Sequence, residues 1–501
     1  MTPRAAIVAC AAVLAACAAP EPPAQPDPAA APAQSCVEWF AALDAAIDEA
    51  GVRDAEAARI AGYPYLRVNR LLAALAPRAA REPAALAALV ERMAALDAAA
   101  REHELANLPP AALAALPDLA TGTRAEARAR TRECARLLRE RDAAAPGGFT
   151  ALPARARVPD AYSSGLRALG LYPLTRHLVA AGVRAWERET RAAFAGGGRV
   201  GAPPAAGAAL VRLAPPAAPR LSYEEAARIL ADAARNPLGI PEPGEAEAKR
   251  LLAAHAPSFE IEVAGDADRF GRLYWKSGQQ APAVDPVAPV VYTRLAHTLV
   301  GDRVLLQLVY TVWFAERPAR APGDIYAGAL DGLVWRVTLA PDGEPLVYDS
   351  IHPCGCYHLF FPTPRARARP APDPLEEWAF VPQTLARPRA GERALLRVAS
   401  GTHYLEGVAF VSGLDSLARY EFVEEEALRS LRAPGGGRRS LYGPDGLVPG
   451  TARRERLLLW PMGICSAGAM RQWGRHATAF VGRRHFDDAD LIERRFALEL
   501  P

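Results

Sequence analysis

Two thiols and two imidazoles lie close together in the second half of the chain. The segment is His352-Pro353-Cys354-Gly355-Cys356-Tyr357-His358, and no other part of the sequence concentrates such side chains. Thiolate and imidazole are preferred ligands of zinc, and they also bind copper and iron. We therefore predict a metal site at His352, Cys354, Cys356 and His358, with His403 as a candidate distant ligand.

The spacing of these residues bears on whether they could share one ion. In a continuous strand every second side chain points to one face, but the outer two would lie ~20 Å apart, whereas metal bonds measure ~2.0 to 2.3 Å. Pro353 and Gly355 favour a turn instead, because proline removes a ladder donor and glycine permits a sharp fold. The spacing also differs from zinc signatures of the Cys-x2-4-Cys type. Structural thiols, buried or bridged to Cys465 or to each other, are an equal alternative.

Cysteine, histidine and aspartate also follow one another in the order of a thiol nucleophile, its base and the group that orients the base. The residues are Cys354 or Cys356, then His403 and then Asp415. This order resembles transglutaminase-like cysteine hydrolases, which implies a thiol hydrolase. That family sets its cysteine at the start of a helix, whereas residues 359–362 predict none. His403 is alternatively a polar residue at a strand end.

Two further segments could add functional groups. Asp324 and Asp331 flank a short Tyr-Ala-Gly segment and could form a carboxylate pair, but we interpret them as turn residues, because aspartate commonly binds turn backbone. The stretch from Cys465 to His485 would contribute ligands if it folds back on the predicted sheet.

The N-terminus indicates export. Arg4 precedes an apolar stretch, Ala5–Ala16, that has the length of a signal-peptide core and is too short to span a bilayer. Leu14-Ala15-Ala16-Cys17 resembles the lipobox of bacterial lipoproteins, which implies that acylated Cys17 anchors the mature protein to a membrane. In that family a residue such as Ala18 implies the outer membrane. We expect an envelope protein that faces the periplasm.

Cysteine use agrees with an oxidising compartment. Cys10 leaves with the signal peptide and Cys17 is acylated, so five cysteines remain, an odd number that requires a free thiol. Cys36 and Cys134, near the two ends of a predicted helical bundle, are expected to form a disulfide that stabilises it. Two separate buried thiols are the alternative.

Composition and periodicity predict an α+β fold, with an alanine-rich helical bundle followed by a mainly antiparallel β-rich domain. Leu86, Leu89, Val90 and Met93 recur at helical spacing, whereas Leu308 to Phe314 is typical of a strand. Gly301-Asp302 and Pro341-Asp342-Gly343 predict hairpin turns. The expected segments are a signal peptide (1–17), a Pro/Ala tether (18–34), the bundle (35–145), a helical connector with Gly/Pro-rich linkers (146–220), a helix with the β domain (221–430), and a glycine-rich loop with a mixed C-terminal part (431–501).

Composition also limits the function. The chain is 51% hydrophobic and 23% charged, as in globular proteins, and its scattered arginines do not predict nucleic-acid binding. The first hypothesis is a lipid-anchored envelope protein that holds zinc, copper or iron in its β domain, as a metal-dependent hydrolase or oxidoreductase. The second is a non-enzymatic binding or assembly lipoprotein with structural cysteines.

Overall fold

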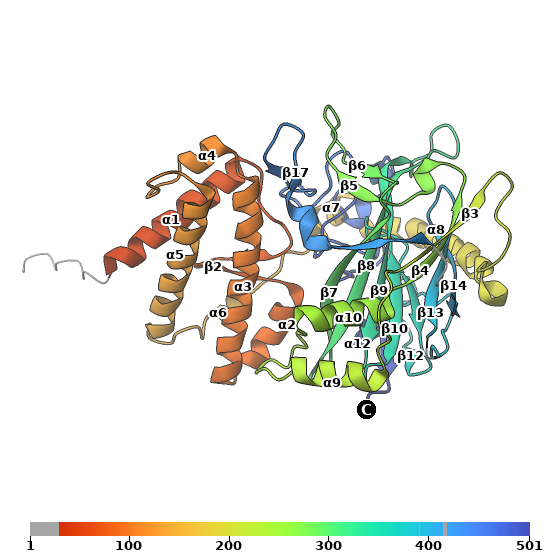
Figure 1. Cartoon of the computed structure of the whole chain (residues 1–501), viewed down its shortest axis with the longest axis horizontal. Helices are drawn as coiled ribbons and strands as arrows, with labels where there is room; N and C mark the ends of the chain where they lie inside the picture. Colours follow the sequence, from red (N-terminus) through yellow and green to blue (C-terminus); the bar gives the residue numbers. More distant parts are fainter. Residues whose placement is uncertain (1–29, 390, 414–417) are drawn as a thin grey trace, which may run out of the picture.

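The computed structural model describes residues 30–389, 391–413 and 418–501. The N-terminal helices α1 to α6 gather on one side of the molecule, and the two large sheets lie on the other with further helices around them, so the predicted α+β class is confirmed (Figure 1). The predicted signal peptide, the acylated Cys17 and Asp415 lie outside the described residues. No helix in these described ranges is long and apolar enough to cross a membrane.

The N-terminal part is helical, with one short hairpin that the sequence analysis did not predict. Helix α1 begins at Ala30, inside the segment predicted as a tether, so the tether prediction is wrong for residues 30–34. Thr123 accepts a hydrogen bond from the Glu126 backbone N–H at 3.3 Å and so caps the N-terminus of α5. The elements are α1 (Ala30–Glu49), β1 (Ala58–Ile60), β2 (Tyr63–Val68), α2 (Arg70–Ala79), α3 (Pro83–Asn107), α4 (Pro110–Ala114), α5 (Arg124–Ala144) and α6 (Leu152–Arg155).

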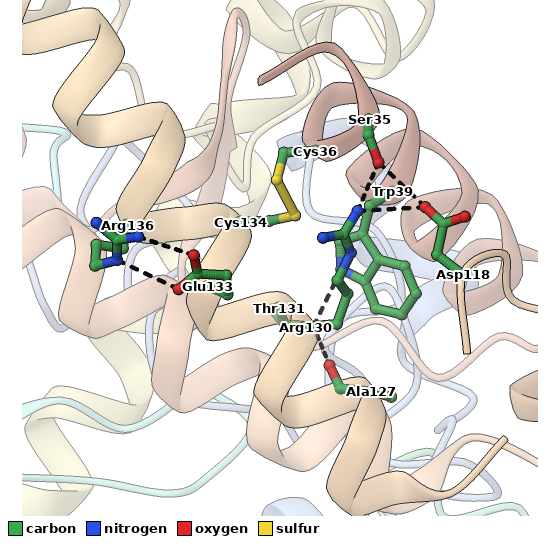
Figure 2. Close-up of a disulfide and its surroundings, with 10 residues drawn as sticks. All are labelled: Ser35, Cys36, Trp39, Asp118, Ala127, Arg130, Thr131, Glu133, Cys134 and Arg136. Carbon is green, nitrogen blue, oxygen red and sulfur yellow. Dashed lines mark hydrogen bonds and ion pairs between the residues drawn. A yellow bond between two sulfur atoms is a disulfide. The ribbon is translucent and has the colours of Figure 1, made fainter. Parts of the chain in front are cut away.

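A disulfide between Cys36 and Cys134 joins α1 to α5, as predicted (Figure 2). Both cysteines are fully buried in the core of the helical part. Next to them, Trp39 Nε1 donates to Thr131 Oγ1 at 3.3 Å, and the Thr131 hydroxyl donates to the Ala127 carbonyl at 2.8 Å. The first and fifth helices are therefore joined both covalently and by a buried polar contact.

A six-stranded sheet in the order β11-β10-β9-β8-β7-β16 forms the centre of the β-rich part. Its neighbours are antiparallel except for β16 and β7, which are parallel. Both predicted hairpins are confirmed, because Gly301-Asp302 joins β7 to β8 and residues 340–344 join β9 to β10. The strands are β7 (Val290–Val300), β8 (Arg303–Arg317), β9 (Gly328–Leu339), β10 (Pro345–Ile351), β11 (Leu359–Pro362) and β16 (Glu421–Glu424).

A five-stranded sheet packs against one face of the first. Along β8, Leu308, Tyr310 and Val312 share the main core with β4 and β13, whereas Val309 and Trp313 belong to other clusters, as the two-residue period of a strand requires. Helices α9 (Tyr223–Ala233) and α10 (Glu245–His255) contribute to the same core. The strand order is β14 (Leu405–Val411), β13 (Arg393–Val398), β4 (Ser258–Val263), β3 (Ala209–Ala214) and β15 (Ala418–Arg419).

The C-terminal part returns to the sheets. Strand β19 pairs with β12, and the Arg471 backbone N–H donates to the Pro353 carbonyl at 3.0 Å. The remaining elements are α7 (Ser164–Leu169), α8 (Tyr172–Ala193), β5 (Arg272–Tyr274), β6 (Ala283–Asp285), β12 (Ala366–Ala368), β17 (Leu431–Arg432), β18 (Arg438–Arg439), α11 (Arg456–Leu459), α12 (Leu491–Arg495), β19 (Phe496–Leu498), and the short 3-10 helices η1 (Ala195–Gly197), η2 (Asp266–Asp268), η3 (Glu425–Ser430) and η4 (Trp460–Met462).

Candidate functional site

The segment with two thiols and two imidazoles forms the turn between β10 and β11. The backbone N–H of His352 donates to the Cys356 carbonyl at 3.0 Å, and that of Gly355 donates to the His352 carbonyl at 2.7 Å. Gly355 has a φ of 92°, and a Cβ there would collide with the Ala477 carbonyl oxygen. The predicted sharp turn is confirmed, and the C-terminal segment folds back against it.

Two of the predicted ligands, His352 and His403, share one buried carboxylate. The Nδ1 atoms of both imidazoles lie 3.0 Å from carboxylate oxygens of Asp331. His403 also stacks on Phe314 with ring centroids 3.9 Å apart, and its Nε2 lies 3.5 Å from Asp268 Oδ1. Three elements therefore meet at Asp331.

The interpretation of Asp331 as a turn residue is wrong, because this aspartate lies within β9 and is 1% exposed. Burial opposes its ionisation, but the charges of His352 and Arg453 and the hydrogen bonds from His352 and His403 outweigh burial and hold the pKa of Asp331 well below its usual value. Asp324 is a turn residue, as predicted, since it accepts a hydrogen bond from the Tyr326 backbone N–H at 2.9 Å. The two aspartates do not form a catalytic pair.

His358 belongs to a different network. Its Nε2 lies 2.8 Å from Asp349 Oδ2, and Asp349 also pairs with Arg336 at 2.6 Å. Burial lowers the pKa of His358 to about 3 despite the neighbouring carboxylate, so the ring is neutral at physiological pH. This histidine therefore supports the sheet through Asp349.

The five predicted metal ligands thus fall into three environments: His352 and His403 at Asp331, His358 at Asp349, and the two thiols beside each other. Across residues 30–389, 391–413 and 418–501, no three or more His, Cys, Asp or Glu side chains are grouped so that they could hold a metal ion. The metal site stays a prediction.

The thiol hydrolase also stays a prediction. A strand rather than a helix follows Cys356, and the partners of His403 are Asp331, Asp268 and Phe314 rather than a cysteine. Its third predicted member, Asp415, lies outside the described residues. The observed contacts therefore place the imidazole with carboxylates and an aromatic ring.

Cys354 and Cys356 form a pair of buried free thiols. Each is less than a tenth exposed. The interaction between the two thiols lowers the pKa of Cys354 and raises that of Cys356 well above its usual value, which is the behaviour of two coupled titrating groups. The pair loses its first proton more readily than an isolated buried cysteine would.

Arg471 fixes the turn that carries the thiols. Its Nε donates to the Cys354 carbonyl at 3.2 Å, and its Nη2 donates to the Cys465 carbonyl at 2.7 Å. Cys465 is the third free cysteine in the described part of the chain, and it is exposed. One buried guanidinium therefore connects the dithiol turn to the C-terminal segment.

An apolar pocket of about 200 Å³ opens beside Cys356. Helix α8 and α11 form one side of it, and the dithiol turn lies at its inner wall. The lining is mainly aromatic and aliphatic, with several acidic side chains. The lining includes Trp186, Tyr326, Cys356, Tyr357, Glu455 and Leu459.

Glu455 is one of the acidic groups that line the pocket, and its charge changes near neutral pH. Burial raises its pKa to about 7, although Arg453 and Arg317 oppose the rise. A carboxyl group that titrates near the working pH can both accept and donate a proton. The pocket therefore combines a thiol with a candidate proton-transfer group.

Arg317 connects the pocket to the Asp331 network through aromatic rings. Its guanidinium lies 4.9 Å from the Tyr404 ring centroid and 5.7 Å from that of Tyr357, and its Nη2 lies 3.1 Å from the Tyr404 hydroxyl. Tyr357 and His403 both have left-handed backbone, with φ of 61° and 53°. Such strained residues persist where surrounding contacts hold them, commonly at functional sites.

Sequence reasoning found the thiols and imidazoles but missed Arg317, Glu455 and Arg471. Each is a single charged residue far along the chain from the dithiol turn, and none stands in a motif with characteristic spacing. The only available signal was the histidine-bearing stretch from Cys465 to His485, which was expected to add ligands only if it folds back on the sheet; the structure shows that it does fold back.

Because a fold hosts many activities, the function must be argued from the residues of this site. No protein-family model, no curated protein and no solved structure matches the chain.

Proposed function

We propose that this chain is an exported, lipid-anchored protein of the bacterial cell envelope that performs thiol–disulfide exchange through Cys354 and Cys356. The location rests on the lipobox-like Leu14-Ala15-Ala16-Cys17. The buried Cys36–Cys134 disulfide supports it, because such bonds persist in oxidising compartments. The activity rests on the dithiol turn and its pocket.

The observation that carries the proposal is the position of the thiol pair. Cys354 and Cys356 are buried free thiols that shift each other's pKa, and Cys356 lines the apolar pocket together with Glu455. Two cysteines separated by one residue cannot have Cα atoms more than about 7 Å apart, which is within the span of a disulfide. Gly355 further tightens the turn between them.

The chemistry needs two displacement steps. Because the pKa shifts favour the thiolate on Cys354, the proton of Cys356 first passes to Cys354 Sγ. The thiolate of Cys356 then attacks one sulfur of a disulfide R–S–S–R′ in the pocket, so that a Cys356–S–S–R bond forms and R′S⁻ leaves. The thiolate of Cys354 then attacks Cys356 Sγ, so that the Cys354–Cys356 disulfide forms and RS⁻ leaves. Two protons pass to the leaving thiolates, and protonated Glu455 is placed to supply one. One disulfide is reduced and the dithiol is oxidised.

The pocket defines the substrate class. Its volume of about 200 Å³ is below the usual range for drug-sized ligands, so it accepts a small compound or the end of a larger chain. Trp186, Tyr357 and Leu459 provide apolar and aromatic walls. We therefore propose a small, largely apolar disulfide, or its dithiol in the reverse direction, as the reactant.

The test uses 2-hydroxyethyl disulfide, a small uncharged probe. The reduced full chain is mixed with the probe, and its thiols are mapped by mass spectrometry after rapid alkylation. We expect Cys354 and Cys356 to become an internal disulfide while Cys36–Cys134 is unchanged. The Cys465→Ser variant is the matched control, because it removes the exposed free thiol and should oxidise at Cys354 and Cys356 at the same rate.

A second variant tests the role of the pocket. Val183 also lines the pocket from α8, so Val183→Trp fills it without touching the thiols directly. This variant should slow oxidation by the probe while the folded state is retained. Equal rates in wild type and Val183→Trp, or thiols that remain reduced in wild type, would overturn the proposal.

A further inference from the structure

A cluster of exposed apolar side chains covers the helices above the pocket. It is called the leucine patch below. Its leucines are each at least 60% exposed, whereas Trp460 is 39% exposed. Exposed apolar clusters of this kind mark interaction surfaces. The members are Leu169, Leu171, Leu174, Leu178, Leu457, Leu458 and Trp460.

The members form one surface because α7, α8 and η4 are in contact. Gly170, between Leu169 and Leu171, lies so close to Pro461 that a Cβ on it would clash. Arg167 Nε donates to the Met462 carbonyl at 2.8 Å, which fixes α7 on η4. Residues 171, 174 and 178 follow the three- and four-residue spacing of one helix face.

We propose that the leucine patch docks on the surface of a phospholipid bilayer, an inference that rests on the proposed envelope location. Leucine and tryptophan on short surface helices, flanked by arginine, are typical of segments that lie at the membrane interface. Arg454 and Arg456 are exposed beside Leu457, and no acidic partner for either appears in the described residues. Two free cations complement the negative headgroups of anionic lipids.

The position of the predicted anchor is compatible with this contact. Twelve residues separate Cys17 from Ala30, the first residue of α1, and such a stretch spans at most about 45 Å. An acylated Cys17 would therefore keep the folded part close to the bilayer. Figure 1 places α8 at the opposite side of the molecule from α1, so the patch would be a second, separate contact.

Docking would also orient the pocket. The pocket is lined by Val183 and Trp186 of α8 and by Leu459 of α11. Their neighbours on the same helices, such as Leu178 and Leu458, belong to the leucine patch. The bilayer would then cover the outer side of the helices whose inner side contacts the pocket. An apolar disulfide that partitions into the membrane would meet the protein at this face.

The test follows tryptophan fluorescence of the full chain in vesicles of phosphatidylethanolamine and phosphatidylglycerol whose acyl chains carry bromine, a quencher. We expect quenching in wild type and its loss in Trp460→Phe, whereas Trp473→Phe retains it. Replacing Leu457 and Leu458 by serine should weaken the quenching several-fold. Val287→Ser is the matched control, because Val287 is exposed outside the patch.

Two results would overturn the docking proposal. The first is equal quenching in wild type and Trp460→Phe. The second is absence of quenching in wild type together with a wild-type dimer in detergent that becomes monomeric when Leu457 and Leu458 are replaced by serine. The patch would then join two copies of the chain rather than contact a bilayer. Oxidation of the dithiol in detergent is measured on the same samples. If quenching is normal but no thiol–disulfide exchange occurs, the proposed activity alone is rejected and the docking proposal stands.

Discussion

At the scale of single residues, Glu455 gives the site a dependence on pH. Its pKa of about 7 in the folded protein exceeds the value near 4.5 of an exposed glutamate, so the folded state keeps a proton that the unfolded state releases. The free energy of unfolding should therefore fall as pH rises from 4.5 to 7, by up to about 3 kcal/mol. Glu455→Gln should remove this decrease, as measured by urea denaturation at several pH values.

Glu424→Gln is the matched control, because Glu424 is exposed and its replacement should leave the slope unchanged. Burial also raises the pKa of Glu425 to about 7. In both variants Glu425 therefore continues to contribute to the pH dependence of the free energy of unfolding. An unchanged pH dependence in Glu455→Gln would contradict the account of this carboxyl group.

Asp331 is predicted to matter more for the fold than any single imidazole. Asp331→Asn removes the carboxylate that His352 and His403 share, and loss of one partner in a buried ionic network costs about 3 to 5 kcal/mol. The pKa of His403, which Asp268 and Asp331 raise against burial, should fall in the variant. Chemical denaturation and NMR titration of the imidazole measure the two effects.

Asp324→Asn serves as the comparison, since replacing this half-buried turn residue should cost less than about 1 kcal/mol. The two aspartates also show what sequence reasoning could reach at this scale. Both received the same interpretation, because their neighbours in sequence resemble a turn, but only the three-dimensional approach of β10 and residues 400–403 makes Asp331 a buried network centre.

At the scale of elements, the turn between β10 and β11 depends on Gly355. An alanine there would adopt a left-handed backbone and also clash with the Ala477 carbonyl. Gly355→Ala should lower the free energy of unfolding by about 2 to 5 kcal/mol. Gly278 is the matched control, because its φ is 74° and no atom lies within 4 Å, so Gly278→Ala carries the backbone cost of about 1 to 2 kcal/mol alone.

Equal losses in the two glycine variants, measured by urea denaturation, would show that the C-terminal segment does not press on the turn.

Turns of this kind were predictable, because Gly301-Asp302, Pro341-Asp342-Gly343 and Pro353 with Gly355 have local signatures. The β1–β2 hairpin was not, since Tyr63 to Val68 lies in an alanine-rich stretch with helical periodicity on both sides.

At the scale of the whole molecule, the Cys36–Cys134 disulfide closes a loop of 98 residues and should stabilise the helical part. Replacing both cysteines by alanine should cost about 2 to 5 kcal/mol, because the unfolded chain gains freedom. Calorimetry should show a lower melting temperature, while oxidation of Cys354 and Cys356 by the probe proceeds as in wild type. Loss of both properties would contradict the separation of a structural disulfide from a reactive dithiol.

The fold class, the order of helices before strands and the disulfide were predictable because they follow from composition, local periodicity and cysteine spacing. The packing of the two sheets and the pocket was not, because Trp186, Cys356 and Glu455 come from three distant segments. Long-range proximity of this kind leaves no periodic signal in one sequence.

The most direct test of the dithiol is trapping of its mixed disulfide. Cys354→Ser leaves the pocket-lining Cys356 without the thiol that would release the first product, so 2-hydroxyethyl disulfide should add one mercaptoethanol to Cys356. In Cys356→Ser, the remaining Cys354 does not line the pocket, and it should react at least about tenfold more slowly. Both variants also carry Cys465→Ser, which removes the exposed free thiol, so intact-mass measurement decides between the outcomes. Absence of the adduct in folded Cys354→Ser, or equal rates in the two variants, would contradict the proposed exchange.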